Sequence, residues 1–320
     1  AKRRQSHRRH AVLWLTARSP SFQQEDSIIF EGFESRRITV SETDIFVRIG
    51  GSGPPVLLLH GYPQTHLIWR DVADLLADGF TVVAPDLRGY GASGKPPTDA
   101  DHTPYSKRAM ARDMVEVMSA LGHDRFFLAG HDRGGRVAYR LTLDHPDRVT
   151  RLATLDIIPT LEQFQQVTRS SAYGSYHWYF LVQPAPFPET MIGANPEYFL
   201  RHTLESWCET PGAFSDEAMA AYIAAFSDPE TIHATCEDYR AGIAIDCDID
   251  QADLDSGHKI DCPMLALWGG AGKPHKRKGV MDTWPRWATS VEGQAIDCGH
   301  FLPEEAPGET AAALREFFSK

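Results

Sequence analysis

The chain has 320 residues, of which 43 are acidic and 32 basic, and its formal net charge is −11. Hydrophobic residues make up 42% and charged residues 23% of the chain, which fits a soluble globular protein and excludes a disordered or fibrous one. The acidic balance argues against nucleic acid as a partner, because that binding needs a basic face that neutralises phosphates.

Basic charge gathers at the amino end of the chain. Residues 1–20 carry six basic side chains and no acidic one. The apolar run at residues 11–15 is shorter than a secretory core, which takes roughly 7–15 residues. We therefore expect residues 1–26 to form a basic, disordered extension that takes no part in the fold. No run approaches the roughly 18 apolar residues of a transmembrane helix, so we expect no membrane partner.

The first predicted elements are short strands that alternate with helices. Strands are expected at residues 37–40, 45–49, 55–60, 81–84, 126–130, 152–155, 264–268 and 294–296. Helices are expected at residues 106–121, 136–143 and 309–318. Most of these strands are unbroken apolar runs, which suit strands buried on both faces of a parallel sheet. The alternation predicts an α/β fold.

Residues 157–260 interrupt this alternation. This segment is rich in aromatic residues and prolines and contains no strong strand pattern, but residues 216–226 read as a helix. We predict an α/β core formed by residues 27–156 and 261–320, with a helical cap at residues 157–260. A cap of this kind closes a site and excludes water.

The sharpest motif is residues 126–135, FFLAGHDRGG, where a strand runs through a turn into a helix. It resembles the nucleophile elbow of the α/β-hydrolases, with Asp132 at the position usually held by serine. Gly130 and Gly134 suit a tight turn that leaves no room for a Cβ atom. A carboxylate in this position attacks sp³ carbon and leaves an alkyl ester, as in carbon–halogen cleavage or epoxide opening. An ordinary turn with a solvated aspartate is the alternative.

Two further residues complete a candidate triad. His300 follows the last predicted strand and suits a base that activates water. The strand at residues 264–268 leads into a segment without a carboxylate, so the acid that orients the histidine is expected elsewhere. Asp156 ends the strand that follows the nucleophile and lies among apolar residues, where an unpaired carboxylate would be costly. We assign the oxyanion-binding N–H groups to Tyr62 and Arg133.

Arginine side chains next to the nucleophile indicate the substrate. Arg133 and Arg136 are separated by an i,i+3 step and can both face the cleft. Because guanidinium groups match carboxylates, the pair favours a small anionic substrate. A salt bridge to Asp132 or to surface acids is the alternative.

Residues from about 30 to 318 resemble the fluoroacetate (haloacetate) dehalogenases. The resemblance rests on the motifs HGYPQTH at 60–66, GHDRG at 130–134, YHW at 176–178, CEDYRAG at 236–242 and GHFLPEE at 299–305. Two positions depart from the usual pattern, Tyr62 where Phe is common and Gly135 where Ala is frequent.

The resemblance implies a role for each matching residue. It implies Asp132 as nucleophile, His300 as base and Asp156 as the acid that orients it. Arg133 and Arg136 would bind the substrate carboxylate. It also implies that the halide pocket is formed by His177, Trp178 and Tyr239. Trp207 would line the cavity. A homodimer is plausible for the family, and no cofactor is expected.

Five cysteines bear on metal binding and location: Cys208, Cys236, Cys247, Cys262 and Cys298. An odd count without a CxxC pair is poor for a disulfide framework or a zinc site. We therefore expect free thiols, a cytoplasmic location and no metal.

Three rival functions remain. An epoxide hydrolase would share Asp132 and His300 and could use Tyr239 and Tyr176 to protonate the epoxide oxygen, but it leaves the arginine pair unexplained. A haloalkane dehalogenase usually has Trp at the position of Arg133. A non-catalytic binding protein of the same fold is the third alternative, although no triad member is missing here.

Overall fold

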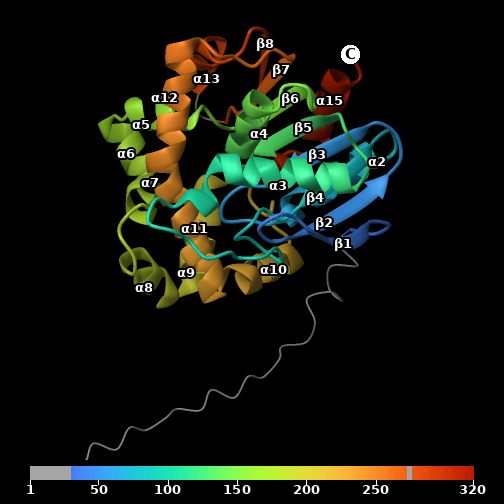
Figure 1. The fold of residues 1–320 in the computed structure, drawn as a ribbon. Helices are drawn as coiled ribbons and strands as arrows, with labels where there is room; N and C mark the ends of the chain where they lie inside the picture. The colour runs from blue at the N-terminus through green and yellow to red at the C-terminus, as the bar shows by residue number, and fades with distance from the viewer. Residues whose placement is uncertain (1–29, 272–275) are drawn as a thin grey trace, which may run out of the picture.

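The structure, a computed structural model, describes residues 30–271 and 276–320. The extension expected at residues 1–26 lies outside these residues. Within the described chain, eight strands form one sheet in the order β1-β2-β4-β3-β5-β6-β7-β8. The pairs β1–β2 and β2–β4 are antiparallel, and all the other pairs are parallel (Figure 1). The predicted α/β class is confirmed.

All eight predicted strands are present, with small differences at their ends. Their bounds are β1 Glu34–Thr39, β2 Asp44–Gly51, β3 Pro55–Leu59, β4 Thr81–Pro85, β5 Phe126–His131, β6 Val149–Leu155, β7 Met264–Gly269 and β8 Val291–Ile296. Every residue of β7 is buried, as are most residues of β3, β4 and β5. This burial on both faces explains why these strands lack polar alternation.

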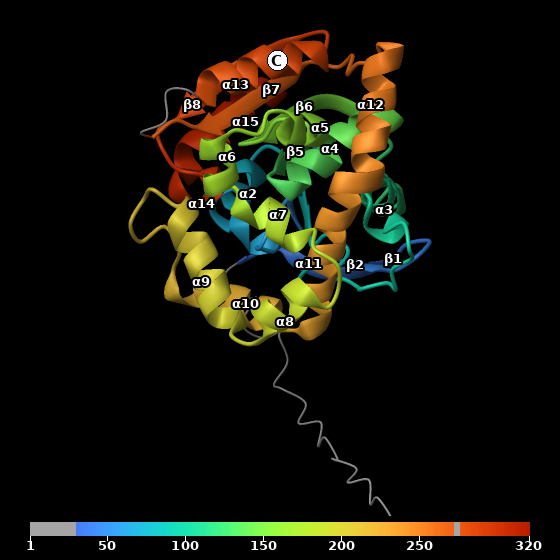
Figure 2. The same cartoon turned by 90° about the vertical axis from the view of Figure 1, so that its left-hand side faces the viewer.

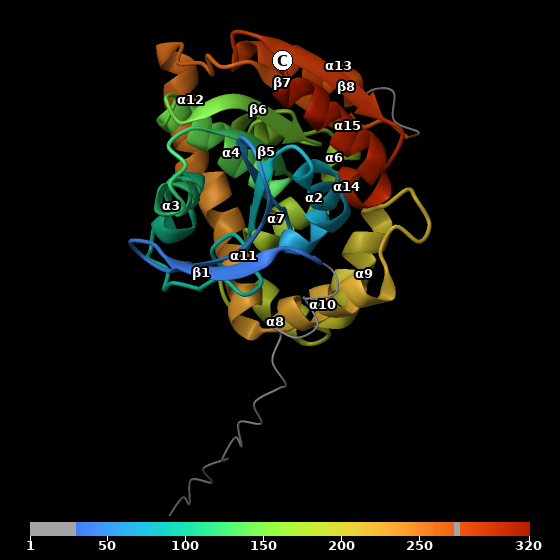
Figure 3. The same ribbon diagram turned by 90° about the vertical axis from the view of Figure 1, so that its right-hand side faces the viewer.

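Helices cover both faces of the sheet. Helices α2 (Arg70–Ala77) and α15 (Pro307–Phe318) pack together on one face, and α3 (Lys107–Ala120) and α4 (Arg133–Asp144) pack together on the other (Figures 1 and 3). Helix α3 begins after Ser106, whose side chain accepts a hydrogen bond from the Ala109 N–H and so caps the helix. The three predicted core helices are confirmed.

Between β6 and β7 all the described elements are helices, joined by loops, and no strand lies among them. The elements are α5 Thr160–Gln165, α6 Arg169–Gly174, α7 Tyr176–Leu181, α8 Phe187–Gly193, α9 Pro196–Trp207, α10 Asp216–Phe226, α11 Pro229–Ala241, η3 Gly242–Asp246 and α12 Cys247–Ser256. The predicted helix at residues 216–226 is α10. Figure 2 looks onto α7, α8, α9 and α11 with the sheet behind them. The division into core and cap at residues 157 and 260 stays a prediction.

The remaining elements are short. They are η1 His66–Trp69, η2 Thr103–Tyr105, α13 Lys276–Thr283, η4 Trp284–Arg286 and α14 Leu302–Glu305. Parallel strands β5, β6 and β8 end at one edge of the sheet, and the segments that follow them carry Asp132, Asp156 and His300. This edge is where sites form in α/β sheets.

Candidate active site

Asp132 occupies the turn between β5 and α4. Its backbone has φ 47° and ψ −117°, a conformation that a residue with a side chain rarely adopts. The turn is possible because its neighbours are glycines: a Cβ atom on Gly134 would lie 2.3 Å from the His60 carbonyl oxygen, and one on Gly130 would lie 2.4 Å from the Gly134 carbonyl oxygen. The two glycines predicted from the motif are therefore required by backbone contact.

Replacing Gly134 with alanine is expected to destabilise the protein. The new methyl group would meet the backbone carbonyls of Leu59 and His60, which cannot move without disturbing β3. We expect the free energy of unfolding to fall by about 3 kcal/mol. Chemical denaturation measures this loss. Gly308→Ala is the matched control, because a Cβ atom there meets nothing within 4 Å, and a loss of similar size in the control would contradict the account.

The Asp132 carboxylate is buried and held by a backbone donor. The Tyr62 N–H donates to Oδ1 at 2.9 Å, and Oδ2 lies 3.9 Å from Nε2 of His300. Burial alone would raise the pKa of Asp132, but the neighbouring histidines and arginines outweigh burial, and its pKa is lowered. The group is therefore ionised at neutral pH, which a carboxylate nucleophile requires.

His300 and Asp156 form the pair expected from their places at the strand ends. Nδ1 of His300 lies 2.7 Å from Oδ2 of Asp156, while Oδ1 of Asp156 accepts the Gly269 N–H at 3.0 Å. These contacts fix the imidazole so that Nε2, which has no hydrogen-bond partner among the described residues, is directed at Asp132. The geometry suits an oriented base.

Two buried guanidinium groups lie beside Asp132. Arg133 and Arg136 are 0% and 3% exposed, and both pack over the ring of Trp178. Nη1 of Arg136 donates to the Ile158 carbonyl oxygen at 2.8 Å. Nη1 of Arg133 and Nε of Arg136 have no partner among the described residues. Buried donors of this kind require an acceptor, so the pair can bind an anion.

The other predicted residues come together around this point. Tyr239 lies on α11, and its ring centroid is 5.3 Å from those of Trp178 and Tyr62 and 5.9 Å from that of His177. The Tyr239 hydroxyl and Nδ1 of His177 are buried without a partner among the described residues. Burial lowers the pKa of His177 to about 3, so its imidazole is neutral and presents one N–H.

The rings of Trp207 and Tyr62 lie next to those of His177 and Tyr239. The Trp207 ring centroid lies 4.4 Å from His177 and 5.5 Å from His300, and its carbonyl oxygen accepts the His300 N–H at 3.1 Å. The Tyr62 ring is buried and its hydroxyl has no partner in the described chain. The N–H of Arg133 opens helix α4, where the first amides lack an intrahelical acceptor. The structure thus brings all ten predicted residues to one place.

Sequence analysis missed a carboxylate that joins the loop carrying His300 to the segment between α9 and α10. Oε2 of Glu305 accepts N–H groups from Gly299 at 2.9 Å, Glu209 at 2.8 Å and Thr210 at 3.0 Å, and Oε1 accepts the Phe301 N–H at 2.9 Å. Burial alone would raise the pKa of Glu305, but these donors lower it. The motif GHFLPEE contains Glu305, but its contacts with residues 209 and 210 are invisible in sequence.

Glu305→Gln is expected to loosen the loop that carries His300. An amide would turn its NH₂ group toward backbone N–H donors. We therefore expect the free energy of unfolding to fall by about 2 kcal/mol and the rate of substrate turnover to fall about tenfold. Because the pKa of Glu305 is depressed in the folded protein, its contribution is present above the unfolded pKa and is lost as the pH falls through the folded pKa. The difference between wild type and variant in thermal stability should therefore narrow in acid; a constant difference would contradict this account.

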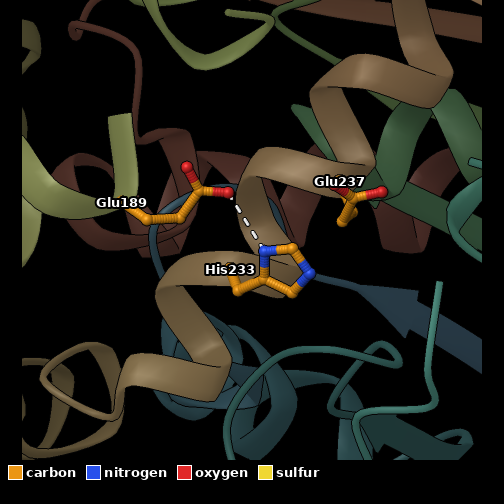
Figure 4. A group of neighbouring side chains, drawn as sticks. All are labelled: Glu189, His233 and Glu237. Atoms are coloured by element: carbon orange, nitrogen blue, oxygen red, sulfur yellow. Dashed lines mark hydrogen bonds and ion pairs between the residues drawn. The ribbon is translucent and has the colours of Figure 1, made fainter. Parts of the chain in front are cut away.

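Away from Asp132, one group of described residues has the side-chain types that bind metal ions. Glu189, His233 and Glu237 lie close together on α8 and α11, and Nδ1 of His233 is 3.0 Å from Oε1 of Glu189 (Figure 4). Arg240 already supplies positive charge there, since its Nη1 lies 2.7 Å from Oε1 of Glu189 and 2.6 Å from Oε1 of Glu237. The group therefore acts as an ion-pair link between the two helices.

Across residues 30–271 and 276–320, no helix combines the length and the apolar character that a membrane crossing requires.

Comparison with known proteins identifies the family. Residues 54–307 match the family model of the α/β hydrolase fold. A fluoroacetate dehalogenase from Burkholderia sp. is 47% identical over 91% of this chain and 95% of its own length. A soluble epoxide hydrolase from Corynebacterium sp. (strain C12) is 37% identical over 84% of this chain and 91% of its own length. A solved structure from Nostoc sp. PCC 7120, described as an α/β hydrolase, superposes with a TM-score of 0.88 at 52% identity, covering 91% of this chain and 99% of that one. The chain therefore belongs to the α/β-hydrolase fold family and is a hydrolase related to fluoroacetate dehalogenase and to epoxide hydrolases.

Proposed function

We propose that the protein is a hydrolytic dehalogenase that converts haloacetates to glycolate and halide through an ester on Asp132. The observation that carries this proposal is the pair of buried guanidinium groups, Arg133 and Arg136, each of which has a nitrogen atom without a partner among the described residues. They lie beside a buried, ionised carboxylate. A neutral substrate would leave these donors unpaired, whereas a substrate carboxylate would accept from both.

In the first step, Asp132 displaces the halide. Oδ1 is held by the Tyr62 N–H, so Oδ2 attacks the halogen-bearing carbon. A C–O bond forms, and the carbon–halogen bond breaks with its electron pair leaving on the halide. Hydrogen-bond donors of His177, Trp178 and Tyr239 stabilise the departing halide, which matters most for fluoride because it is a poor leaving group.

In the second step, the ester is hydrolysed. Nε2 of His300 takes a proton from water, and the hydroxide attacks Cγ of Asp132 while Asp156 stabilises the imidazolium. The negative charge develops on Oδ1, where the Tyr62 N–H receives it, with the Arg133 N–H as the second donor. The ester bond then breaks, and His300 returns its proton to the glycolate oxygen. Asp132 loses the remaining proton of water to solvent.

Halide release from matched substrates tests the function. We expect purified protein to release fluoride from fluoroacetate or chloride from chloroacetate, both read with ion-selective electrodes. Chloroacetamide, which is similar in size but neutral, should be turned over at least about 100-fold less efficiently, because it forms no ion pair with the arginines. Arg136→Leu should reduce this preference. Equal turnover of acid and amide would overturn the proposal.

Epoxide hydrolysis is the second candidate. The buried hydroxyl of Tyr239, which has no partner within residues 30–271 and 276–320, could protonate an epoxide oxygen. A relative that is 37% identical is named an epoxide hydrolase. The second tyrosine this reaction would use, Tyr176, is 39% exposed. Styrene oxide is the comparison substrate, and turnover of the epoxide without turnover of any haloacetate would favour this candidate.

A further inference from the structure

The guanidinium of Arg133 is held on one side by a carboxylate from the cap. Nε of Arg133 donates to Oδ2 of Asp238 at 2.9 Å, and Nη2 donates to Oδ1 at 2.7 Å and to the Asp238 carbonyl oxygen at 2.8 Å. This is a two-point pairing between planar groups, supplemented by a backbone acceptor. It uses the nitrogens on one side of the guanidinium and leaves Nη1 as the atom without a partner in the described chain.

Asp238 is fixed by further contacts of its own. The Tyr90 hydroxyl donates to Oδ2 at 2.7 Å, and Nζ of Lys107 contacts Oδ1. Asp238, Lys107 and Tyr90 are each no more than 1% exposed. Burial alone would raise the pKa of Asp238, but Arg133 and Lys107 outweigh burial and hold that pKa well below its usual range. The carboxylate is therefore ionised and anchored to the core at Lys107 and Tyr90.

The surroundings of Arg133 restrict its plane as well. The Tyr239 ring, on the residue that follows Asp238, lies 4.1 Å from the guanidinium carbon. At the start of the π-helical segment η3, a Cβ atom on Gly242 would lie 3.2 Å from Nη2 of Arg133. Arginine has a long, flexible side chain, so an arginine already held in its binding orientation loses less entropy when it binds.

We infer that Asp238 is a positioning residue for anion recognition: it orients Arg133 so that Nη1 meets the carboxylate of a small anionic substrate. This inference rests on the proposed function and adds a residue to it. In a simpler role, Asp238 only neutralises a buried arginine. That role predicts the opposite change in anion affinity when Asp238 is replaced. Removing a negative charge near the site would then strengthen anion binding, whereas loss of positioning would weaken it.

Asp238→Asn separates the two roles. The amide keeps one acceptor but cannot receive both Nε and Nη2, so the two-point pairing is lost. We expect the KM for chloroacetate and the dissociation constant for acetate, measured by calorimetry, each to rise about tenfold, with kcat changing less than about threefold. A purely structural defect would lower the fraction of protein that is active. It would therefore lower the apparent kcat without raising KM.

Two other variants keep the test decisive. Tyr90→Phe removes only the hydroxyl that donates to Asp238, so it should raise both constants in the same direction, by about twofold to threefold. Asp246→Asn is the control: Asp246 also contacts Lys107, whose backbone N–H it accepts at 2.8 Å and whose Nζ lies 3.6 Å from its Oδ2, but no hydrogen bond joins Asp246 to Arg133. The variant leaves the two-point pairing of Arg133 with Asp238 in place, so both constants should stay near the wild-type values.

The outcomes distinguish this inference from the proposed function. If wild type releases halide but Asp238→Asn and Tyr90→Phe bind acetate as tightly as wild type or more tightly, the positioning role is wrong and the function stands. If wild type releases no halide, the proposed function fails, and acetate binding still decides the role of Asp238. Wild-type protein that does not bind acetate at all would overturn the inference.

Discussion

Asp132→Asn is expected to lower halide release from haloacetates by about 10⁴-fold or more, because the amide cannot form the alkyl ester on which the proposed reaction depends. The side chain keeps its size, so the Tyr62 N–H should still find an acceptor and the fold should persist. Electrode assays measure the activity, and thermal unfolding checks the fold. The exposed Asp101→Asn is the matched control and should retain wild-type activity.

Deamidation could restore aspartate in the Asp132→Asn variant. Mass spectrometry of the intact protein, taken before and after the assay, identifies that recovery. Immediate activity within about tenfold of wild type in protein that has not deamidated would mean that Asp132 is not the nucleophile.

His300→Asn is expected to stop the reaction after its first step. Displacement by Asp132 needs no base, whereas hydrolysis of the ester does. The variant should therefore release about one equivalent of halide per site and then stop, because it lacks Nε2 of His300, which faces Asp132 and has no hydrogen-bond partner in the part of the chain that the structure describes. A carboxymethyl adduct should appear on the peptide that contains Asp132.

A surface histidine provides the control for His300→Asn. His258 pairs with Asp253 and its side chain is 45% exposed, so His258→Asn should turn over normally without an adduct. Steady turnover by His300→Asn at a rate near that of wild type would remove His300 from the role of base.

Much of this fold could be predicted because its strongest signals are local. The buried strands appear as unbroken apolar runs, and α3, α4 and α15 are long enough to show an apolar face. Helices α5, α6 and α7 have only six residues each, which is too short for a clear periodicity, so the segment between β6 and β7 was predicted only as broadly helical.

The site residues also differ in how far they could be predicted. Those marked by nearby sequence were found, and those defined by contacts between distant parts of the chain were not. Asp132, Asp156 and His300 could be found because each follows a strand at the same edge of the sheet. Asp238 could not be assigned, since its pairing with Arg133 spans 105 residues and depends on how α11 lies over the elbow. Glu305 was missed for the same reason. The cytoplasmic location and the homodimer remain predictions from the sequence.

Solvent isotope labelling tests the central claim, an ester on Asp132, most directly. Wild-type protein is allowed many turnovers of a haloacetate in H₂¹⁸O, and the peptide containing Asp132 is then examined by mass spectrometry. Each cycle of ester hydrolysis places a solvent oxygen on the carboxylate, so we expect ¹⁸O in this peptide and, in the first turnover, unlabelled glycolate. An unlabelled peptide with ¹⁸O in the first glycolate formed would show direct attack by water and would contradict the account.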